Sequence, residues 1–364
     1  MKGSINIALI VGLAFSFVTK QGMAQDPTLS QFNLNKYFYN PAYTGDHRGY
    51  QVAATYRTLW PSIPGKAFPG PLSTYYGYFD GYLQRGRSYT AGAGIFAMQD
   101  IEGEGVLKTS TLGISYAQHF AKIGGTSEKA PRIEMSIGFK YYVNFISINW
   151  DKLIFIDDLD IDRGITGESE YPQQGIGKKV TTDLDLGLTL KNNFKGKNKW
   201  YNEIGFSMAH VLSPSLSMTG SNTDASRLPK KYIGSYRTSI GIKKNRVYLG
   251  TTLLFEKQNK FQVLNSGIDI YFHPKGDNSI IPLWFSVMNR SPLKTDGENT
   301  NALIGSLKYK WHSGKKKKVV YFIGISVDIP YSGLALKTKG AYELSVGATI
   351  PKKKQWRVSA CPMF

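Results

Sequence analysis

The sequence predicts an all-β fold, a transmembrane antiparallel up-and-down β-barrel of about 14 strands. From about residue 50 onward, short segments alternate apolar and polar residues, as strands with one apolar face do. Most are close to the ~9–11 residues that a tilted transmembrane strand requires, and their even number suits a bacterial single-chain barrel. Beyond residue 24 no apolar run approaches the ~20 residues of a spanning helix, so strands have to make any crossing.

The alternation is clear near the C-terminus of the chain. In the stretch 341–350, Leu344 and Val346 share an apolar face, opposite Glu343 and Ser345. The segments that we expect to be strands are 51–60, 73–80, 90–98, 107–119, 132–144, 180–191, 199–209, 232–243, 247–256, 261–272, 281–289, 300–311, 318–329 and 341–350.

A soluble β-sandwich or propeller is the competing interpretation, because alternation there also marks one buried face. Three features favour the membrane barrel. The polar faces mix Gly, Ser and Thr with charges, as a barrel interior does, and no repeat of fixed period indicates propeller blades. The third feature is a gathering of aromatic residues near strand ends, as in interface girdles: Tyr141, Tyr142, Trp150, Trp200, Tyr201, Tyr271, Phe272, Trp284, Trp311 and Trp356.

The N-terminus has the features of a secretory signal peptide. A positively charged start precedes the apolar run 5–18, and small residues end at Ala24, so we expect cleavage between Ala24 and Gln25. Together with the predicted barrel, the signal peptide indicates an integral outer-membrane protein that is exported across the inner membrane. We divide the chain into the signal peptide (1–24), a periplasmic N-terminal lead-in (25–50) and an outer-membrane β-barrel with a periplasmic C-terminal tail (51–364).

The chain is strongly basic, with a formal net charge of +19 and a pI near 9.6. For an exported protein this favours a membrane surface or an acidic protein partner over nucleic acid. If the barrel starts and ends in the periplasm, the periplasmic connections hold roughly twenty Lys and Arg against about two acids, whereas the outer connections are about balanced. This basic face predicts docking of an acidic periplasmic partner; solvated turns touching anionic lipid headgroups are the alternative. Its densest parts are Lys315, Lys316, Lys317, Lys318, Lys352, Lys353 and Lys354.

No feature of the sequence predicts an enzyme or a cofactor site. No Cys/His metal spacing, nucleophile elbow or triad order is present, so we expect no catalytic residues. Cys361 is the only cysteine, which excludes an intrachain disulfide. The five histidines lie in different predicted connections or strand ends: His47, His119, His210, His273 and His312.

One acidic stretch resembles the start of a calcium loop. Asp158, Asp160 and Asp162 are spaced at i, i+2 and i+4. Arg163 stands where an EF-hand needs Gly, and Ser169 stands at the twelfth position. A solvated acidic loop is therefore the favoured interpretation, with calcium as the alternative.

Charged residues also fall on the predicted inner faces of the strands. They could line a pore, or they could form ion pairs that fill the lumen, which we favour. These residues are Glu134, Lys140, Asp183, Asp185, Arg237 and Asp328.

Residues 39–45 read Tyr-Asn-Pro-Ala-Tyr-Thr-Gly, and a Tyr-Arg pair and a Trp follow in the first predicted strand. The chain ends in Cys-Pro-Met-Phe. These features resemble the PorP/SprF family, outer-membrane barrels associated with type IX secretion and gliding motility in Bacteroidetes. The family motif residues are Asn40, Pro41, Ala42, Tyr43, Gly45, Arg57 and Trp60.

The resemblance implies a non-enzymatic barrel that helps to secrete, or to anchor at the surface, specific adhesin-type cargo with C-terminal sorting domains. The implied partners are the C-terminal domain of the secreted cargo, periplasmic components of the secretion and gliding motor, and outer-membrane lipid. No catalytic residue is carried over from the family. A passive outer-membrane porin or small-solute transporter is the alternative function.

The aromatic stretch 35–45 precedes the first predicted strand. Pro41 biases Asn40 toward an extended backbone, and Gly45 permits a turn. The rings of this stretch are expected to pack at the periplasmic interface or into the barrel mouth. A plug that closes the N-terminus against the barrel is the favoured interpretation; direct partner contact is the alternative.

Overall fold

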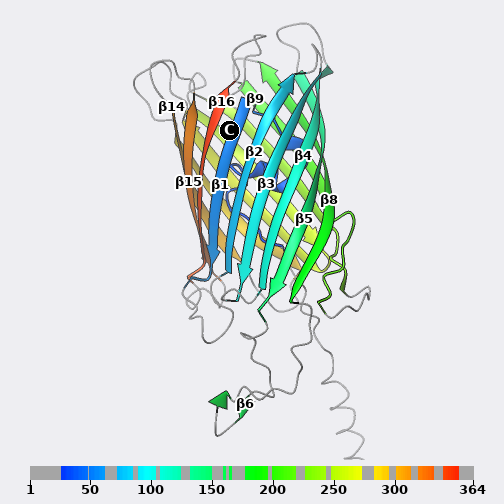
Figure 1. Cartoon of the computed structure of the whole chain (residues 1–364). Helices are drawn as coiled ribbons and strands as arrows, with labels where there is room; N and C mark the ends of the chain where they lie inside the picture. Colours follow the sequence, from blue (N-terminus) through cyan, green and yellow to red (C-terminus); the bar gives the residue numbers. More distant parts are fainter. Residues whose placement is uncertain are drawn as a thin grey trace, which may run out of the picture.

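Fourteen strands close into one antiparallel barrel in the computed structural model (Figure 1). The structure describes residues 26–47, 49–61, 72–84, 89–103, 107–123, 132–149, 159–160, 164–165, 177–195, 199–218, 226–242, 247–272, 283–294, 301–312, 319–331 and 339–351. The barrel strands are β1 (Gly49–Leu59), β2 (Leu72–Gln84), β3 (Tyr89–Glu102), β4 (Leu107–Ile123), β5 (Arg132–Ile148), β8 (Lys178–Lys195), β9 (Lys199–Ala209), β10 (Lys231–Ile242), β11 (Val247–Gln258), β12 (Phe261–Phe272), β13 (Leu283–Lys294), β14 (Ala302–His312), β15 (Val320–Pro330) and β16 (Ala341–Pro351).

Each strand pairs with its neighbours along the chain, and β1 closes the barrel by pairing with β16. Gly49 lies opposite Pro351 in that pair, so the barrel starts and ends at one rim. We call this rim the terminus end; it is the upper end in Figure 1. The connections at this rim are those that the sequence analysis grouped as basic. The other rim, where β9 ends at Ala209, is called the opposite end.

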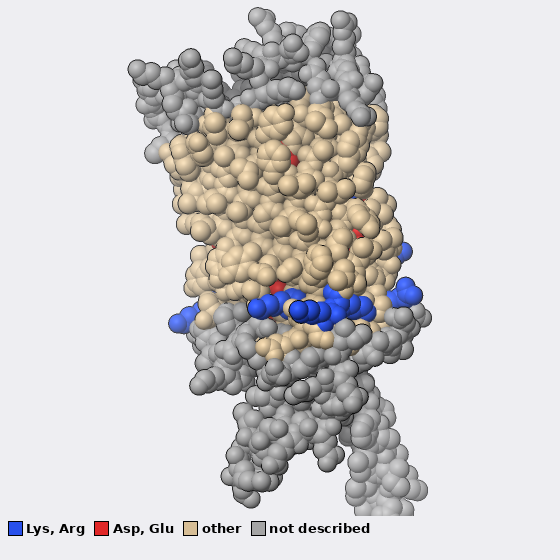
Figure 2. All heavy atoms as spheres, viewed as in Figure 1, with Lys and Arg blue, Asp and Glu red and all other residues tan. Residues whose placement is uncertain are grey.

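The two faces of the wall differ sharply in polarity. Large apolar side chains point outward, for example Ile95, Leu112 and Val287, which are 55–59 % exposed. Polar and charged side chains point inward and are buried, among them Thr252 and Glu256. Figure 2 shows one side of this exterior as a broad band almost free of charged residues, with Lys and Arg gathered near the opposite end. This is the pattern of a lipid-facing barrel with a polar interior.

All fourteen predicted strands are confirmed, and several are longer than their alternating cores. β5, for instance, continues to Ile148 beyond the predicted end at 144. The structure adds a short two-stranded sheet between β5 and β8, β6 (Leu159–Asp160) with β7 (Gly164–Ile165), which is not among the predicted strands. Among the described residues, no helix is long and apolar enough to cross a membrane.

The expected aromatic girdle is only partly correct. Tyr141, Trp200, Phe272 and Trp311 do face outward, each at least 36 % exposed. Four other rings instead point into the barrel, because their positions fall on the inner face of the alternation. Those four buried residues are Tyr142, Tyr201, Tyr271 and Trp284; Trp150 and Trp356 lie outside the described residues.

Candidate functional site: the segment inside the barrel

Residues 26–47, here called the lumen segment, lie inside the barrel (Figure 1). The segment contains one helical turn, α2 (Lys36–Tyr39), and one 3₁₀ turn, η2 (Pro41–Tyr43). Its side chains and backbone bond to residues on the inner faces of β1, β4, β12 and β16, and of strands between them. Asp26 meets His210 at the opposite end, whereas the segment joins β1 at the terminus end. The segment therefore runs through the lumen from one rim to the other. The sequence analysis expected it to pack only at the periplasmic interface or in the barrel mouth.

Asn40 fixes the middle of the lumen segment to the barrel wall. Its backbone is extended, as expected for the residue before Pro41. Its side-chain amide donates to the carbonyls of Leu188 and Phe206, both at 3.1 Å. Its side-chain oxygen accepts from the Ala42 N–H at 2.9 Å and so caps η2. The Asn40 side chain thus makes hydrogen bonds to two strands of the wall and to the turn η2.

Gly45 makes the turn out of η2, as the sequence predicted. Its φ is +72°, a conformation that residues with a Cβ rarely adopt. Its N–H donates to the Asp80 carboxylate at 2.6 Å. A Cβ at this position would also lie 2.6 Å from the Cα of Gly92 in β3. Two glycines therefore allow backbone to touch backbone where the lumen segment meets the wall.

Other wall glycines make room for the same segment. A Cβ at Gly187 would lie 2.1 Å from the side-chain oxygen of Asn40. A Cβ at Gly138 would lie 2.6 Å from the carbonyl oxygen of Pro41. The glycines on the polar faces are thus a complementary surface for the segment, in addition to reducing the bulk of the barrel interior.

An aromatic cluster fills the space between the lumen segment and the wall. Tyr37 and Tyr39 are 3 % exposed. The Tyr37 ring lies 4.8 Å from that of Tyr78, and its hydroxyl lies 2.6 Å from the Ser115 hydroxyl. The Phe38 ring packs edge-on against Tyr76 at 5.1 Å between centroids. The barrel thus has a hydrophobic core inside the polar lining.

Glu343 in β16 binds the start of the lumen segment. Its carboxylate accepts from the backbone N–H groups of Ser30 and Gln31, at 2.5 and 3.1 Å. Arg57 lies between Glu343 and Asp328, at 3.4 and 2.9 Å. The Arg57 guanidinium also donates to the Ser30 hydroxyl. The motif arginine therefore anchors this segment directly through Ser30 and indirectly by holding the acids Glu343 and Asp328.

Glu203 in β9 is the centre of a second cluster. Its carboxylate pairs with Lys36 at 3.1 Å and with Arg237 at 3.3 Å. It also accepts from the Tyr43 hydroxyl at 3.0 Å. Lys191 lies 4.0 Å away and pairs more closely with Asp46. A buried carboxylate with several donors around it holds two points of the lumen segment at once.

His210 and Asp26 form a latch at the opposite end. The two imidazole nitrogens lie 2.7 Å from Asp26 and 2.7 Å from Asp183. Burial alone would lower the pKa of His210, but Asp26 and Asp183 raise it to about 10. Burial likewise opposes ionisation of Asp26, yet His210 and Lys231 hold its pKa well below the usual value. Asp26, at the start of the lumen segment, is therefore held by an ion pair with His210.

The structure brings most of the motif residues together. Asn40, Pro41, Ala42, Tyr43 and Gly45 lie in the lumen segment, and Arg57 reaches its first part. Trp60 lies apart from the others. It follows β1 at the opposite end, where its backbone N–H donates to the Gly340 carbonyl at 2.7 Å.

The predicted interior charges also lie in or near this network. Arg237 and Asp328 form the ion pairs described above, and Asp183 pairs with His210. Lys140 donates to the Phe38 carbonyl at 2.7 Å, and Asp185 accepts from the Tyr142 hydroxyl. The interpretation of charges that fill the lumen agrees with these contacts.

Sequence reasoning missed the residues that hold the lumen segment most firmly, Glu203 and Glu343. Both occupy inward positions of an alternating strand, which was the available signal, but nothing local distinguishes them from pore-lining acids.

Two predicted sites fall mainly outside the described residues. The docking lysines 315–318 and 352–354 lie outside them, as do Asp158 and Asp162 of the calcium candidate. Asp160 is in β6. Within the described ranges, no group of three or more His, Cys, Asp and Glu residues is arranged to hold a metal ion.

The model of the family described as type IX secretion system membrane protein PorP/SprF matches residues 21–348, and the chain belongs to this family. It is a secretion-related outer-membrane barrel. No curated protein matches the sequence.

Solved barrels resemble the chain at low identity. The CymD monoaromatic hydrocarbon channel is 11% identical, with a TM-score of 0.47 over 91% of this chain and 96% of that one. A FadL homologue of Pseudomonas aeruginosa is 12% identical, with a TM-score of 0.44 over 87% and 94%. BamA of Haemophilus ducreyi lacking POTRA domains 1–3 is 10% identical, with a TM-score of 0.40 over 93% and 78%.

Proposed function

We propose that this member of the PorP/SprF family is a plugged, non-enzymatic scaffold. It helps to secrete or anchor specific surface cargo with C-terminal sorting domains, and it docks periplasmic components of the secretion system. The observation that carries the proposal is the lumen segment, which crosses the barrel and is bound from both rims. A passive porin needs a free aqueous path, whereas a scaffold needs a rigid wall and specific rims.

The orientation of the barrel assigns a role to each rim. Bacterial single-chain barrels begin and end in the periplasm. On that basis the terminus end is periplasmic, and its basic connections attract an acidic partner. The opposite end then faces outward, with the long connection between β5 and β8 and the latch at Asp26. Cargo is recognised at this outer end, where the longer connections lie.

The docking part of this proposal is tested by charge reversal. All seven lysines of the basic face (315–318 and 352–354) are changed to Glu, and partners are captured from the native envelope after cross-linking. The control reverses the exposed lysines Lys108, Lys178 and Lys257, which lie near the opposite end. We expect the first variant to insert normally but to lose periplasmic partners at physiological salt, while the control keeps them. Undiminished capture by the first variant would contradict docking through this face.

A further inference from the structure

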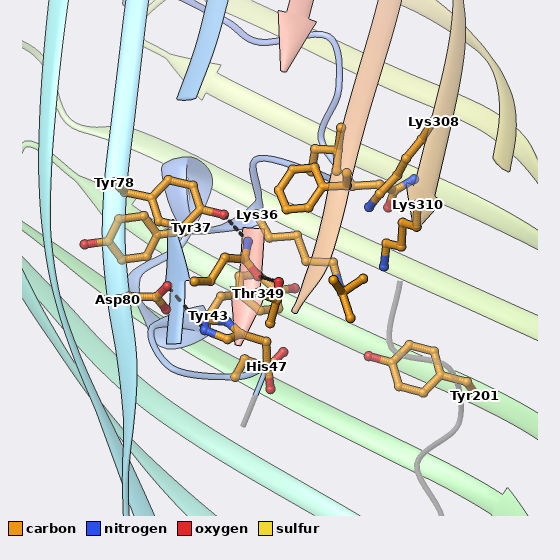
Figure 3. A pocket seen from close by; sticks show the side chains of 16 residues that line it. Lys36, Tyr37, Tyr43, His47, Tyr78, Asp80, Tyr201, Lys308, Lys310 and Thr349 are labelled. Atoms are coloured by element: carbon orange, nitrogen blue, oxygen red, sulfur yellow. Dashed lines mark hydrogen bonds and ion pairs between the residues drawn. The ribbon is translucent and has the colours of Figure 1, made fainter. Parts of the chain in front are cut away.

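A cavity of about 220 Å³ lies between the lumen segment and the wall near the terminus end (Figure 3). Its lining includes Lys308 and Lys310 of β14, together with Val320 and Thr349, which stand at or near strand ends of this rim. Since one water occupies ~30 Å³ in the liquid, the cavity holds only a small group and a few waters. It is smaller than the ~300–1,000 Å³ of sites for drug-sized molecules. A single small group fits it best.

The two lysines on the β14 side of the cavity have no acidic partner among the residues that the structure describes. Lys308 is 7 % exposed, and its ammonium lies 5.0 Å from the Trp284 ring centroid and 5.3 Å from that of Phe322. Lys310 is two residues along the same strand and so faces the same side. Among the described residues, neither ammonium forms an ion pair with a carboxylate. By contrast, Lys36, Lys191 and Lys231 each pair with at least one acid, and the buried Lys140 donates to the Phe38 carbonyl.

The acids of the cavity lie on the other side and are already engaged. Figure 3 shows Asp80 and His47 next to each other on one side of the cavity, and Lys308 and Lys310 on the other side. Asp80 accepts from the Gly45 N–H and lies 3.5 Å from the His47 ring. Asp46 pairs with Lys191, and Lys36 pairs with Glu203. Burial lowers the pKa of His47 to about 4, so its ring is neutral at physiological pH.

Two neighbouring ammonium groups, Lys308 buried and Lys310 half-buried, are unfavourable by themselves without a counter-charge. Burial removes hydration from each, and their mutual repulsion adds to that cost. Aromatic rings beside Lys308 offset only a part of it. An anion between the two ammonium groups would remove both penalties through charge-assisted hydrogen bonds.

We propose that this cavity is a binding site for one small anionic group, a carboxylate or a phosphate, held by the ammonium groups of Lys308 and Lys310. The group enters from the terminus end. It is supplied either as a free anion or as the acidic group of a lipid. This site is independent of the cargo and docking roles proposed above.

Binding is measured on the purified full-length barrel in a neutral detergent, in a buffer without phosphate or carboxylate. Inorganic phosphate and acetate are titrated separately against sodium chloride of equal ionic strength. The readouts are the melting temperature and the tryptophan fluorescence, because Trp284 lies beside Lys308. The test variants are Lys308→Met with Lys310→Met, and each single Lys→Gln substitution. The control is Lys257→Met, at an exposed position of β11.

We expect at least one of the two anions to raise the melting temperature of the wild type and of the control beyond the effect of chloride. The double variant should give no such response, and in anion-free buffer it should melt at or above the wild-type temperature. Each single variant should bind the anion about tenfold or more weakly, as the loss of one charge-assisted hydrogen bond predicts. If the double variant does not fold, the two single variants decide the question.

Two preparations of the protein distinguish a free anion from a lipid as the source of the anionic group. Protein refolded without lipid responds to added anion in either case. Protein extracted from native membranes responds equally if the site takes a free anion, and weakly if a lipid already occupies it. A wild type that responds to neither anion, or variants that respond as the wild type does, would overturn the proposal.

Discussion

The outer and inner faces of the barrel wall meet different requirements: the outer face has to be apolar, whereas the inner face has to match the residues that it contacts. Along β16, Leu344 and Val346 face outward and meet the requirement for apolar surface one residue at a time. Glu343 and Ser345 face inward, and their side chains bond to residues of the lumen segment and of β1. The exterior is therefore specified locally, whereas the interior is specified by a partner more than 300 residues away. Substitutions on the two faces should differ accordingly.

The largest expected effect on the inner face is at Glu203. Glu203→Gln leaves Lys36 and Arg237 without their shared counter-charge, which should lower the free energy of unfolding by about 3–5 kcal/mol. Denaturant titration in detergent measures this. The outward-facing control Gln99→Ala in β3 should change stability by less than about 0.5 kcal/mol. Equal effects of the two substitutions would contradict the distinction between the faces.

A smaller effect is expected where the lumen segment touches a wall glycine. Gly187→Ala places a methyl group on the Asn40 side chain and should cost about 1–3 kcal/mol. Gly234→Ala in β10 is the matched control, because no atom lies within 4 Å of the added Cβ. Thermal unfolding of both variants measures the difference. If Gly187→Ala were as stable as the control, the segment would not be held against β8.

The smallest expected effect concerns the latch at the opposite end. The pKa of His210 is about 10 in the folded protein and about 6.5 in an unfolded chain, so the folded state binds more protons. The contribution of His210 to the latch is fully present below about pH 6.5 and is lost as pH rises toward about 10. Between about pH 7 and about pH 9 the loss should be about 1–2 kcal/mol, since Asp26 is partly exposed.

The variant His210→Gln isolates this contribution. Its melting temperature should decline less than that of the wild type over the same pH range, because glutamine does not titrate. Parallel declines of the two proteins would show that the latch does not contribute to the pH dependence.

The same comparison explains what could be predicted from the sequence. All fourteen strands were predictable because period-two alternation is a local signal, as in β15 and β16. The ends of β5 and β8 were not, because these strands continue past the alternating core. The extended Asn40 and the turn at Gly45 followed from Pro and Gly chemistry.

The inner network could not be predicted in the same way. Arg57 and Glu343 are 286 residues apart in the chain, and no local pattern pairs them. The inward aromatic residues, such as Trp284, were taken for a girdle because composition does not say which face a ring occupies. The lumen segment was expected at one mouth, because its reach depends on wall contacts that only the closed barrel creates.

Single-channel conductance in planar bilayers tests the central claim, that the lumen segment closes the barrel. The wild type should give no steps or only small ones, since residues 26–47 occupy the lumen. Deletion of these residues should produce larger steps; if that variant does not insert, Asn40→Ala with Glu343→Gln should produce frequent brief openings by loosening the segment. Large, steady steps from the wild-type protein would contradict the account and favour a porin.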